Sequence, residues 1–186
     1  MSIDAMLENQ TTDEPALWVG ELYAAYATAI GAYIHSLVHD WSLAHDLTQE
    51  TFLQLYQTRA RLHDVTNRRA WLYRIASHVA LNALKRRRRF VWLPWTPLLD
   101  HIHFSWTTME TDVDSRNAVE TALAAVPEQY RAPLLLYTVY GFRTREIADM
   151  LNISVDAVKQ RLHRAREHFR QAYCADDDAF GIKGEE

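Results

Sequence analysis

Basic side chains at helical spacing near the end of the chain have the right chemistry to bind DNA. Lys159, His163 and Arg166 share one face of an expected helix, where cations can pair with phosphates and donate to base edges. Ser154 is placed to cap this helix, and Asp156 in its first turn suits the positive end of the helix dipole. The segment therefore predicts a helix that enters a DNA major groove.

A short helix before it would hold the basic helix in place. Residues 144–151 carry apolar side chains at helical spacing, and a three-residue turn follows, which is the layout of a helix-turn-helix. The two apolar stripes that can face each other are formed by Ile147, Ala148 and Leu151 on the first helix and Val158, Leu162, Ala165 and Phe169 on the second. A solvated amphipathic hairpin is the alternative interpretation.

Five consecutive basic residues, 85–89, end another expected helix, over residues 68–88. Positive charge suits a helix C-terminus, but a run of this length exceeds that need, and a phosphate backbone would relieve its repulsion. The helix and the loop before it also offer aromatic and polar groups, which suit unpaired bases. These candidates are Arg61, His63, Asn67, Arg68, Arg69, Trp71, Tyr73, Arg74, Ser77 and Asn82. The alternatives are a solubilising tract for the basic run and core packing for Trp71 and Tyr73.

A third helix, expected over residues 42–60, has a different surface. Asp46, Gln49, Glu50 and Leu53 fall at i, i+3, i+4 and i+7, so that they form one stripe of acidic, amide and apolar groups. The helix has no basic residue before Arg59, which favours a protein partner over DNA. On charge alone, a solvated face is an equally good interpretation.

Composition and charge limit the class of protein. The net charge is −4, but residues 1–57 hold eight acidic and no basic residues, whereas residues 58–90 hold ten basic and one acidic. A phosphate backbone responds to such local patches rather than to the average. Cys174 is the single cysteine, and no apolar run is long enough to span a bilayer. We therefore expect a cytoplasmic protein without disulfides, membrane insertion or a secretory signal.

No alternating strand pattern is present, so the sequence predicts an all-α fold of two small helical domains. Helices are expected over residues 17–38, 42–60 and 68–88, with Ser42 as a cap, and then from residue 115 onward. Pro133 should kink its helix or shift the helix start. The expected division is an acidic tail (1–14), a first domain (15–90), an aromatic and proline-containing linker (91–114), a second domain (115–173) and an acidic tail (174–186).

Three motifs occur in a characteristic order along residues 17–173. They are Asp46–Phe52, then Trp71–Ala76 leading into the basic run, and finally Glu146–Ala148 with Val158–Arg166. This order resembles that of bacterial RNA polymerase sigma factors of the sigma-70 family, in the compact extracytoplasmic-function (ECF) group. The resemblance implies a promoter-specificity subunit with a region 2 bundle, an irregular linker and a region 4 helix-turn-helix.

The resemblance also implies roles for the candidate residues. The third-helix face would bind the β′ clamp helices of core RNA polymerase, through Asp46, Leu47, Gln49, Glu50, Phe52, Leu53 and Tyr56. The candidates between Arg61 and Asn82, together with Lys85 and Arg86, would recognise and help to melt the −10 element, in part as a single strand.

Near the polymerase β flap, the helix-turn-helix would read the −35 element in duplex form. The residues implied are Arg143, Thr144, Ser154, Asp156, Ala157, Lys159, Gln160, Arg161, His163, Arg164 and Arg166. The linker would pass through the polymerase cleft and let the two domains occupy separated sites, and an anti-sigma factor is an expected partner. Asn152 stands in the turn where the family usually has glycine, and asparagine tolerates a left-handed backbone.

Two other classes of protein compete with this interpretation. A stand-alone helix-turn-helix regulator shares the Glu146–Ala148 signal, but that class would add a domain built on strands. A metal-dependent enzyme is suggested by His35 and His39 at i, i+4 and by His101 and His103. No zincin-type glutamate follows His35, and no phosphate loop or activated nucleophile is apparent. We therefore expect no catalysis, no cofactor and no metal site.

Overall fold

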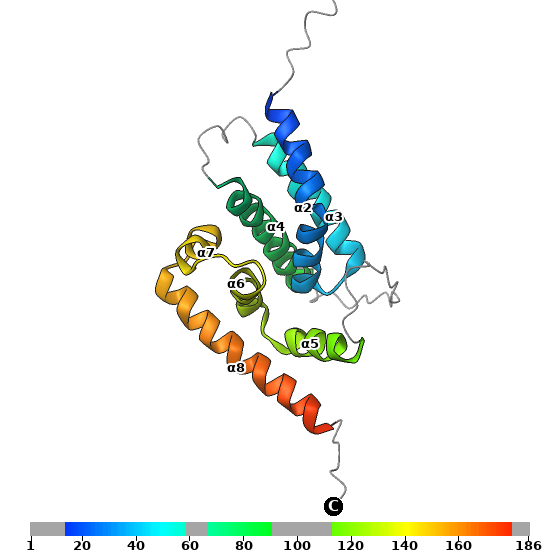
Figure 1. Cartoon of the computed structure of the whole chain (residues 1–186), viewed down its shortest axis with the longest axis vertical. Coiled ribbons are helices and arrows are strands. Elements are labelled where there is room, and N and C mark those ends of the chain that lie inside the picture. The colour runs from blue at the N-terminus through cyan, green and yellow to red at the C-terminus, as the bar shows by residue number, and fades with distance from the viewer. Residues whose placement is uncertain (1–13, 59–66, 91–112, 180–186) are drawn as a thin grey trace, which may run out of the picture.

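The structure is a computed structural model that describes residues 14–58, 67–90 and 113–179, and every regular element in these ranges is an α-helix (Figure 1). This confirms the all-α fold class. The candidates Arg61 and His63, nearly all of the predicted linker (residues 91–112) and most of both predicted tails lie outside the described residues.

Three helices make up the amino-terminal group: α2 (Glu14–Val38), α3 (Trp41–Gln57) and α4 (Arg68–Phe90). They pack pairwise around a core whose fully buried members include Ile30, Leu55 and Leu72. The cap of α3 differs from the prediction, because Asp40 rather than Ser42 accepts the hydrogen bond from the Leu43 backbone N–H, at 3.0 Å. Asp40 has the extended backbone that a capping residue needs, whereas Ser42 already lies inside the helix.

Four helices make up the carboxyl-terminal group: α5 (Val113–Ala125), α6 (Glu128–Thr138), α7 (Thr144–Leu151) and α8 (Val155–Ala179). The long α8 packs along the other three (Figure 1). Pro133 is buried inside α6, so the helix start is not shifted past it. Because α8 continues to Ala179, the part of the predicted tail from residue 174 to 179 is helical.

The helix-turn-helix is built as the sequence predicts. Asn152 has the left-handed backbone (φ +53°) between α7 and α8, and the Ser154 hydroxyl accepts from the Ala157 backbone N–H at 3.1 Å. The apolar stripes of the two helices meet, and Ile147 and Val158 have no solvent exposure. This packing fixes the direction of the opposite, polar face of α8.

The two groups of helices are in direct contact rather than apart. α7 lies against α4, and α6 lies against α2 (Figure 1). The buried apolar residues of both groups form one continuous cluster. We call this packing of α2–α4 against α5–α8 the closed arrangement.

Candidate nucleic-acid and polymerase interface

The polar face of α8 is open to solvent. Five of its predicted −35 contacts are exposed, namely Lys159, Gln160, His163, Arg164 and Arg166. Their local contacts are weak: Lys159 lies 3.4 Å from Asp156, and the Arg166 guanidinium lies over the Tyr137 ring at 5.4 Å. Exposed ion pairs of this kind contribute little to stability. The face therefore remains available for a ligand.

The remaining −35 candidates surround that face. Arg143, Ser154 and Asp156 are exposed, and Thr144, Ala157 and Arg161 are partly exposed. All six belong to the start of α7 or the first two turns of α8, together with the residues that precede them. The structure thus brings together every residue predicted for this element.

The predicted −10 residues on α4 are divided between surface and interior. Asn67, Arg68, Asn82, Lys85 and Arg86 are exposed. Arg69, Trp71 and Arg74 are partly exposed, and the last two contact each other through a guanidinium–ring distance of 5.2 Å.

Tyr73 and Ser77 lie in the core of the closed arrangement, where neither side chain is accessible to DNA. The Ser77 hydroxyl lies 2.7 Å from that of Tyr33 and also bonds the Tyr73 carbonyl. Burial raises the pKa of Tyr73 to about 12, and nearby Arg69 acts in the opposite direction. The reason for their burial is that α4 packs on α2 and α3 and also on α7, so little of its middle stays exposed.

The α3 residues predicted to bind polymerase are also only partly on the surface. Asp46, Gln49, Leu53 and Tyr56 are exposed, with Leu53 at 57%, and Glu50 is partly exposed. Leu47 and Phe52 are buried, and in this structure they belong to the core instead of the surface stripe. The Phe52 ring meets the Tyr23 ring edge-on, with centroids 4.8 Å apart, so it joins α3 to α2.

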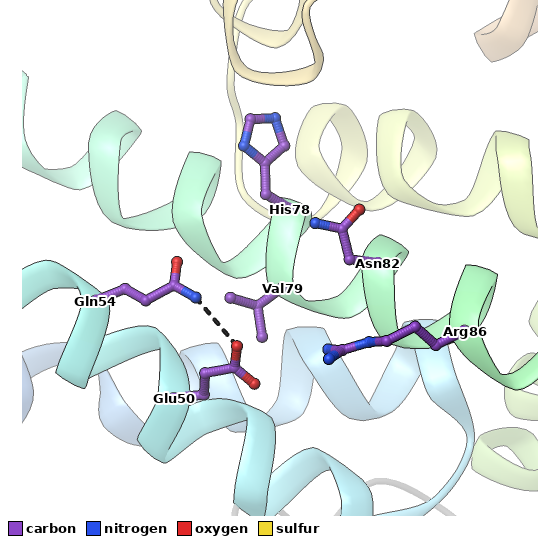
Figure 2. Close-up of a pocket in the computed structure, with 6 residues that line it drawn as sticks. All are labelled: Glu50, Gln54, His78, Val79, Asn82 and Arg86. Atoms are coloured by element: carbon purple, nitrogen blue, oxygen red, sulfur yellow. Dashed lines mark hydrogen bonds between the residues drawn. The ribbon is translucent and has the colours of Figure 1, made fainter.

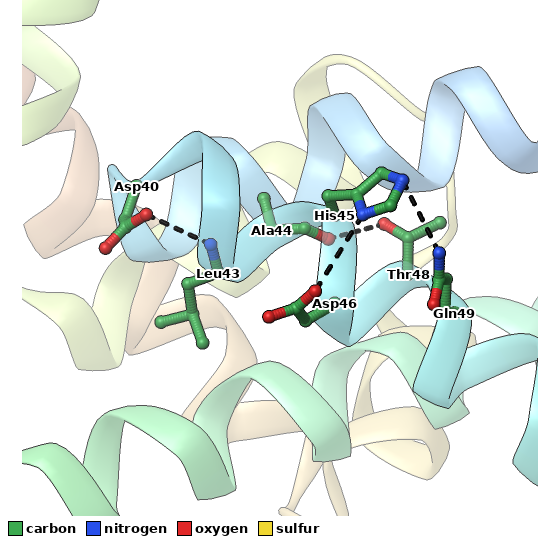
Figure 3. A network of polar contacts seen from close by, with 7 residues as sticks. All are labelled: Asp40, Leu43, Ala44, His45, Asp46, Thr48 and Gln49. Carbon is green, nitrogen blue, oxygen red and sulfur yellow. Dashed lines mark hydrogen bonds and ion pairs between the residues drawn. The ribbon is translucent and has the colours of Figure 1, made fainter. Parts of the chain in front are cut away.

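Polar contacts position the start of this stripe (Figure 3). The His45 ring lies between two of its members, 3.8 Å from the Asp46 carboxylate and 3.5 Å from the Gln49 amide. The Thr48 hydroxyl donates to the Ala44 carbonyl at 2.7 Å, so this polar group is satisfied within the helix. The result is an exposed face of acid, amide and apolar groups held on a regular helix.

A groove of about 370 Å³ runs between α3 and α4 and joins the two predicted surfaces (Figure 2). Its lining residues are Glu50, Gln54, His78, Val79, Asn82 and Arg86. Gln54 donates to the Glu50 carboxylate at 3.1 Å, while desolvation, followed by the charges of Arg74 and Lys85, lowers the pKa of His78. Gln54 and His78 are not among the residues predicted from the sequence, although helical spacing could have found them: Gln54 lies four residues after Glu50, and His78 lies four residues from both Arg74 and Asn82.

The histidine pair that raised the question of a metal has another role. The His35 ring stacks on Trp41 with centroids 3.6 Å apart. Within the described residues, no three histidine, cysteine or acidic side chains are grouped as metal ligands. His101 and His103 lie outside these residues. Likewise, none of the helices in the described ranges is long and apolar enough to span a membrane.

Both groups of helices match models of known protein families. Residues 22–90 match Sigma-70 region 2, and residues 116–169 match Sigma-70, region 4. The chain belongs to the sigma-70 family and is an ECF sigma factor. Members of this family are promoter-specificity factors of RNA polymerase and not enzymes themselves.

Curated relatives agree with the assignment. The chain is 23% identical to the ECF RNA polymerase sigma factor SigM of Bacillus subtilis, over 83% of this chain and 94% of that protein. It is 29% identical to RNA polymerase sigma factor CarQ of Myxococcus xanthus, over 81% and 86%. The match to the probable RNA polymerase sigma factor RfaY of Xanthomonas campestris (27%) covers 96% of this chain but 47% of that protein.

Two solved structures share the fold. One is the sigma factor RpoE in complex with the anti-sigma factor NepR from Bartonella quintana, with a TM-score of 0.72, 19% identity and coverage of 84% of this chain and 97% of that one. The other is CnrH in complex with the cytosolic domain of CnrY, with a TM-score of 0.61, 22% identity and coverage of 85% and 88%.

Proposed function

We propose that this sigma factor binds core RNA polymerase through α3, recognises and helps to melt the −10 element through α4, and reads the −35 element through α8. The observation that carries the proposal is that two exposed basic faces and one acidic and apolar face lie on different helices of the same chain. Three ligand surfaces of different chemistry suit a subunit that joins a polymerase to two parts of a promoter.

The α3 surface suits the β′ clamp helices. Exposed Leu53 and Tyr56 supply apolar contact area, and Asp46 and Glu50 supply charge that a basic partner would complement. Glu50 also borders the groove that Asn82 and Arg86 line from α4. Polymerase contact and promoter contact would thus meet at neighbouring side chains.

The α4 and α8 surfaces suit two different forms of DNA. On α4, cations lie beside Trp71 and the amides of Asn67 and Asn82, a combination that suits unstacked bases. On α8, Lys159, Gln160 and Arg164 follow the capped start of a helix, which is the part that reads base edges in a major groove. The β flap would lie near this second group of helices.

The division into domains and the further partners are part of the same proposal. Residues 15–90 would act as the core and −10 domain and residues 115–173 as the −35 domain, with the intervening residues as a linker. The complexes of RpoE with NepR and of CnrH with CnrY support an anti-sigma partner for this chain also. The site of action would be the bacterial cytoplasm, where core polymerase is found.

Transcription in vitro with purified bacterial core polymerase and genomic DNA tests the proposal. Promoter-specific transcripts that need both components are expected, and a footprint of the complex should protect two elements at once. Binding to a single duplex element with no effect of core polymerase would favour a stand-alone regulator instead.

A further inference from the structure

The closed arrangement depends on residues that the proposed function needs for DNA. Arg69, a predicted −10 contact, donates a hydrogen bond from Nη2 to the Tyr140 carbonyl at 2.5 Å. Its guanidinium also lies 4.5 Å from the centroid of the Phe142 ring and 5.7 Å from that of Tyr73. A planar cation with a carbonyl partner and two aromatic neighbours is well held.

Tyr140 is the centre of the contact between the two groups of helices. Its ring lies 5.4 Å from that of Tyr33 and 4.7 Å from that of Tyr73, both of which belong to the amino-terminal group. Its hydroxyl donates to the Ala29 carbonyl on α2 at 3.3 Å. Both of these ring contacts of Tyr140 therefore cross between the groups, and Phe142 adds another to Tyr73 at 5.2 Å.

Two more polar links between the groups involve residues at the two ends of α4. The Asn67 amide donates to the Glu146 carboxylate at 3.2 Å, and Arg88 of the basic run pairs with Glu128 at 3.1 Å. Both Asn67 and Arg88 lie on or beside the α4 surface proposed for the −10 element. In contrast, Lys159 and Arg164 on α8 remain exposed.

The contact between the groups leaves space beside it. A groove of about 620 Å³ lies where Arg74 faces Asp149, Asn152 and Ser154 of the helix-turn-helix. The groups therefore meet through buried apolar side chains, the aromatic cluster around Tyr140 and a few polar links, with an open groove next to Arg74. Among these links, the Arg131 guanidinium donates to the Leu37 carbonyl at 3.2 Å. Packed groups of helices of this kind can separate as rigid bodies without unfolding.

We propose that Arg69 and Tyr140 form an autoinhibitory contact that holds the free sigma factor closed and that must break before α4 can bind the −10 element. This inference rests on the proposed function, because it assigns regulation to the same α4 surface. It requires no partner protein, since all of the groups belong to this chain. The closed protein would keep its −35 face available, while Arg69, Tyr73 and Ser77 of its −10 surface are held in the contact between the groups.

The distance between the two groups reports on this contact directly. The single native cysteine, Cys174 on α8, is exposed, and Ser42→Cys adds a second exposed label site on α3. Double electron–electron resonance between spin labels at these sites should give one narrow distribution for the otherwise unaltered chain. Tyr140→Ala should shift the distribution to longer distances and broaden it.

Matched variants separate this contact from general damage. Tyr137→Ala removes another tyrosine of the same region, 41% exposed, whose ring contacts Arg166 within its own group, so its distribution should not change. Tyr140→Phe keeps the ring and loses the bond to Ala29, so an intermediate result is expected. If Tyr140→Ala loses its helical circular dichroism, Arg69→Lys tests the other side of the contact, because lysine lacks the planar guanidinium.

Binding to a forked promoter fragment with a single-stranded −10 segment gives the functional result. Loss of each aromatic pair should favour the open form by about 2- to 10-fold, so Tyr140→Ala should bind this DNA more tightly by at least that factor. Unchanged distances in both Tyr140→Ala and Arg69→Lys, or a broad distribution in the unaltered chain, would overturn the proposal. The distance measurement uses no promoter DNA. If the proposed function is wrong, the measured distances therefore stay as expected, and the failure appears only in the DNA-binding and transcription assays.

Discussion

The Nη2 atom of Arg69 lies 2.5 Å from the backbone carbonyl oxygen of Tyr140, 71 residues further along the chain. This bond joins the two groups of helices at the residue where α4 is expected to meet the promoter. Under the proposed function, the closed arrangement and the DNA-bound arrangement would be alternatives, because one guanidinium cannot serve both.

The α8 face should control recognition of the upstream element. Lys159→Ala and Arg164→Ala should each weaken binding by ~1–3 kcal/mol if the side chain contacts a base edge. Arg170→Ala, which removes an exposed cation further along the same helix, should cost less. Gel-shift titrations of the three variants with a −35 duplex and core polymerase would check this, and equal losses would indicate non-specific attraction only.

The α3 face should separate polymerase affinity from stability. Leu53→Glu and Glu50→Lys change surface residues, so they should weaken core binding with little effect on the free energy of unfolding. Phe52→Ala should destabilise the fold by ~3–5 kcal/mol, because it empties a buried site against Tyr23. Urea unfolding would measure the change in stability, and native gel shift would measure the affinity for core polymerase. If Leu53→Glu and Glu50→Lys both keep full core affinity, the partner surface lies elsewhere.

The basic run should contribute to salt dependence unevenly. Lys85 and Arg86 form no ion pair with another described residue, whereas Arg87 lies 3.9 Å from Asp40 and Arg88 lies 3.1 Å from Glu128. Replacing Lys85 and Arg86 by alanine should reduce the salt slope of promoter binding by up to ~0.7–0.9 per lost phosphate contact. Titrations at several salt concentrations measure the slope, and an unchanged slope would contradict phosphate binding by these residues.

Folding stability should fall in mild acid. Partial desolvation, then the charge of Arg131 and the His35 ring, lowers the pKa of His39 to about 4, and desolvation lowers the pKa of His35 against the opposing charges of Glu120 and Asp40. The unfolded chain, with histidine near pKa ~6.5, therefore binds more protons than the folded chain between these values. The free energy of unfolding should have its full value above about pH 6.5 and should decrease as the pH falls toward 4.

His39→Asn tests that prediction at a matched backbone position. His39 has a left-handed backbone (φ +54°), which asparagine also tolerates. The variant should lose less stability than the unaltered chain between pH 7 and pH 4.5 in urea unfolding experiments. The same decrease in both proteins would exclude His39 as a source of the pH dependence.

The sequence predicts well the features whose causes are local. The helix-turn-helix was predicted down to its Ser154 cap and its left-handed Asn152, because period, cap and turn all lie within a few residues of each other. The sequence leaves core packing of Tyr73 as an alternative to base contact, and it does not predict the burial of Ser77. Helical period shows which residues share a face, but it cannot distinguish a face that meets DNA from one that meets Tyr33 or Tyr140, far away in the chain.

The α3 stripe illustrates the same limit at shorter range. Leu53 and Tyr56 are exposed as predicted, but Phe52 and Leu47 belong to the neighbouring face and pack inward. A rotation of about 100° per residue separates Phe52 from Leu53, so grouping them as one surface joined two faces of the helix. The Asp40 cap was missed by two residues for a related reason, because both Asp40 and Ser42 are good caps and the preceding helix decides between them.

Promoter-specific transcription by purified core polymerase tests the proposed function, when this chain is compared with Lys159→Ala, with Leu53→Glu and with core polymerase alone. We expect transcripts from a small set of promoters that depend on the chain, and their loss or marked reduction in both variants. Absence of any chain-dependent transcript with bacterial core polymerase, or full activity of both variants, would contradict it.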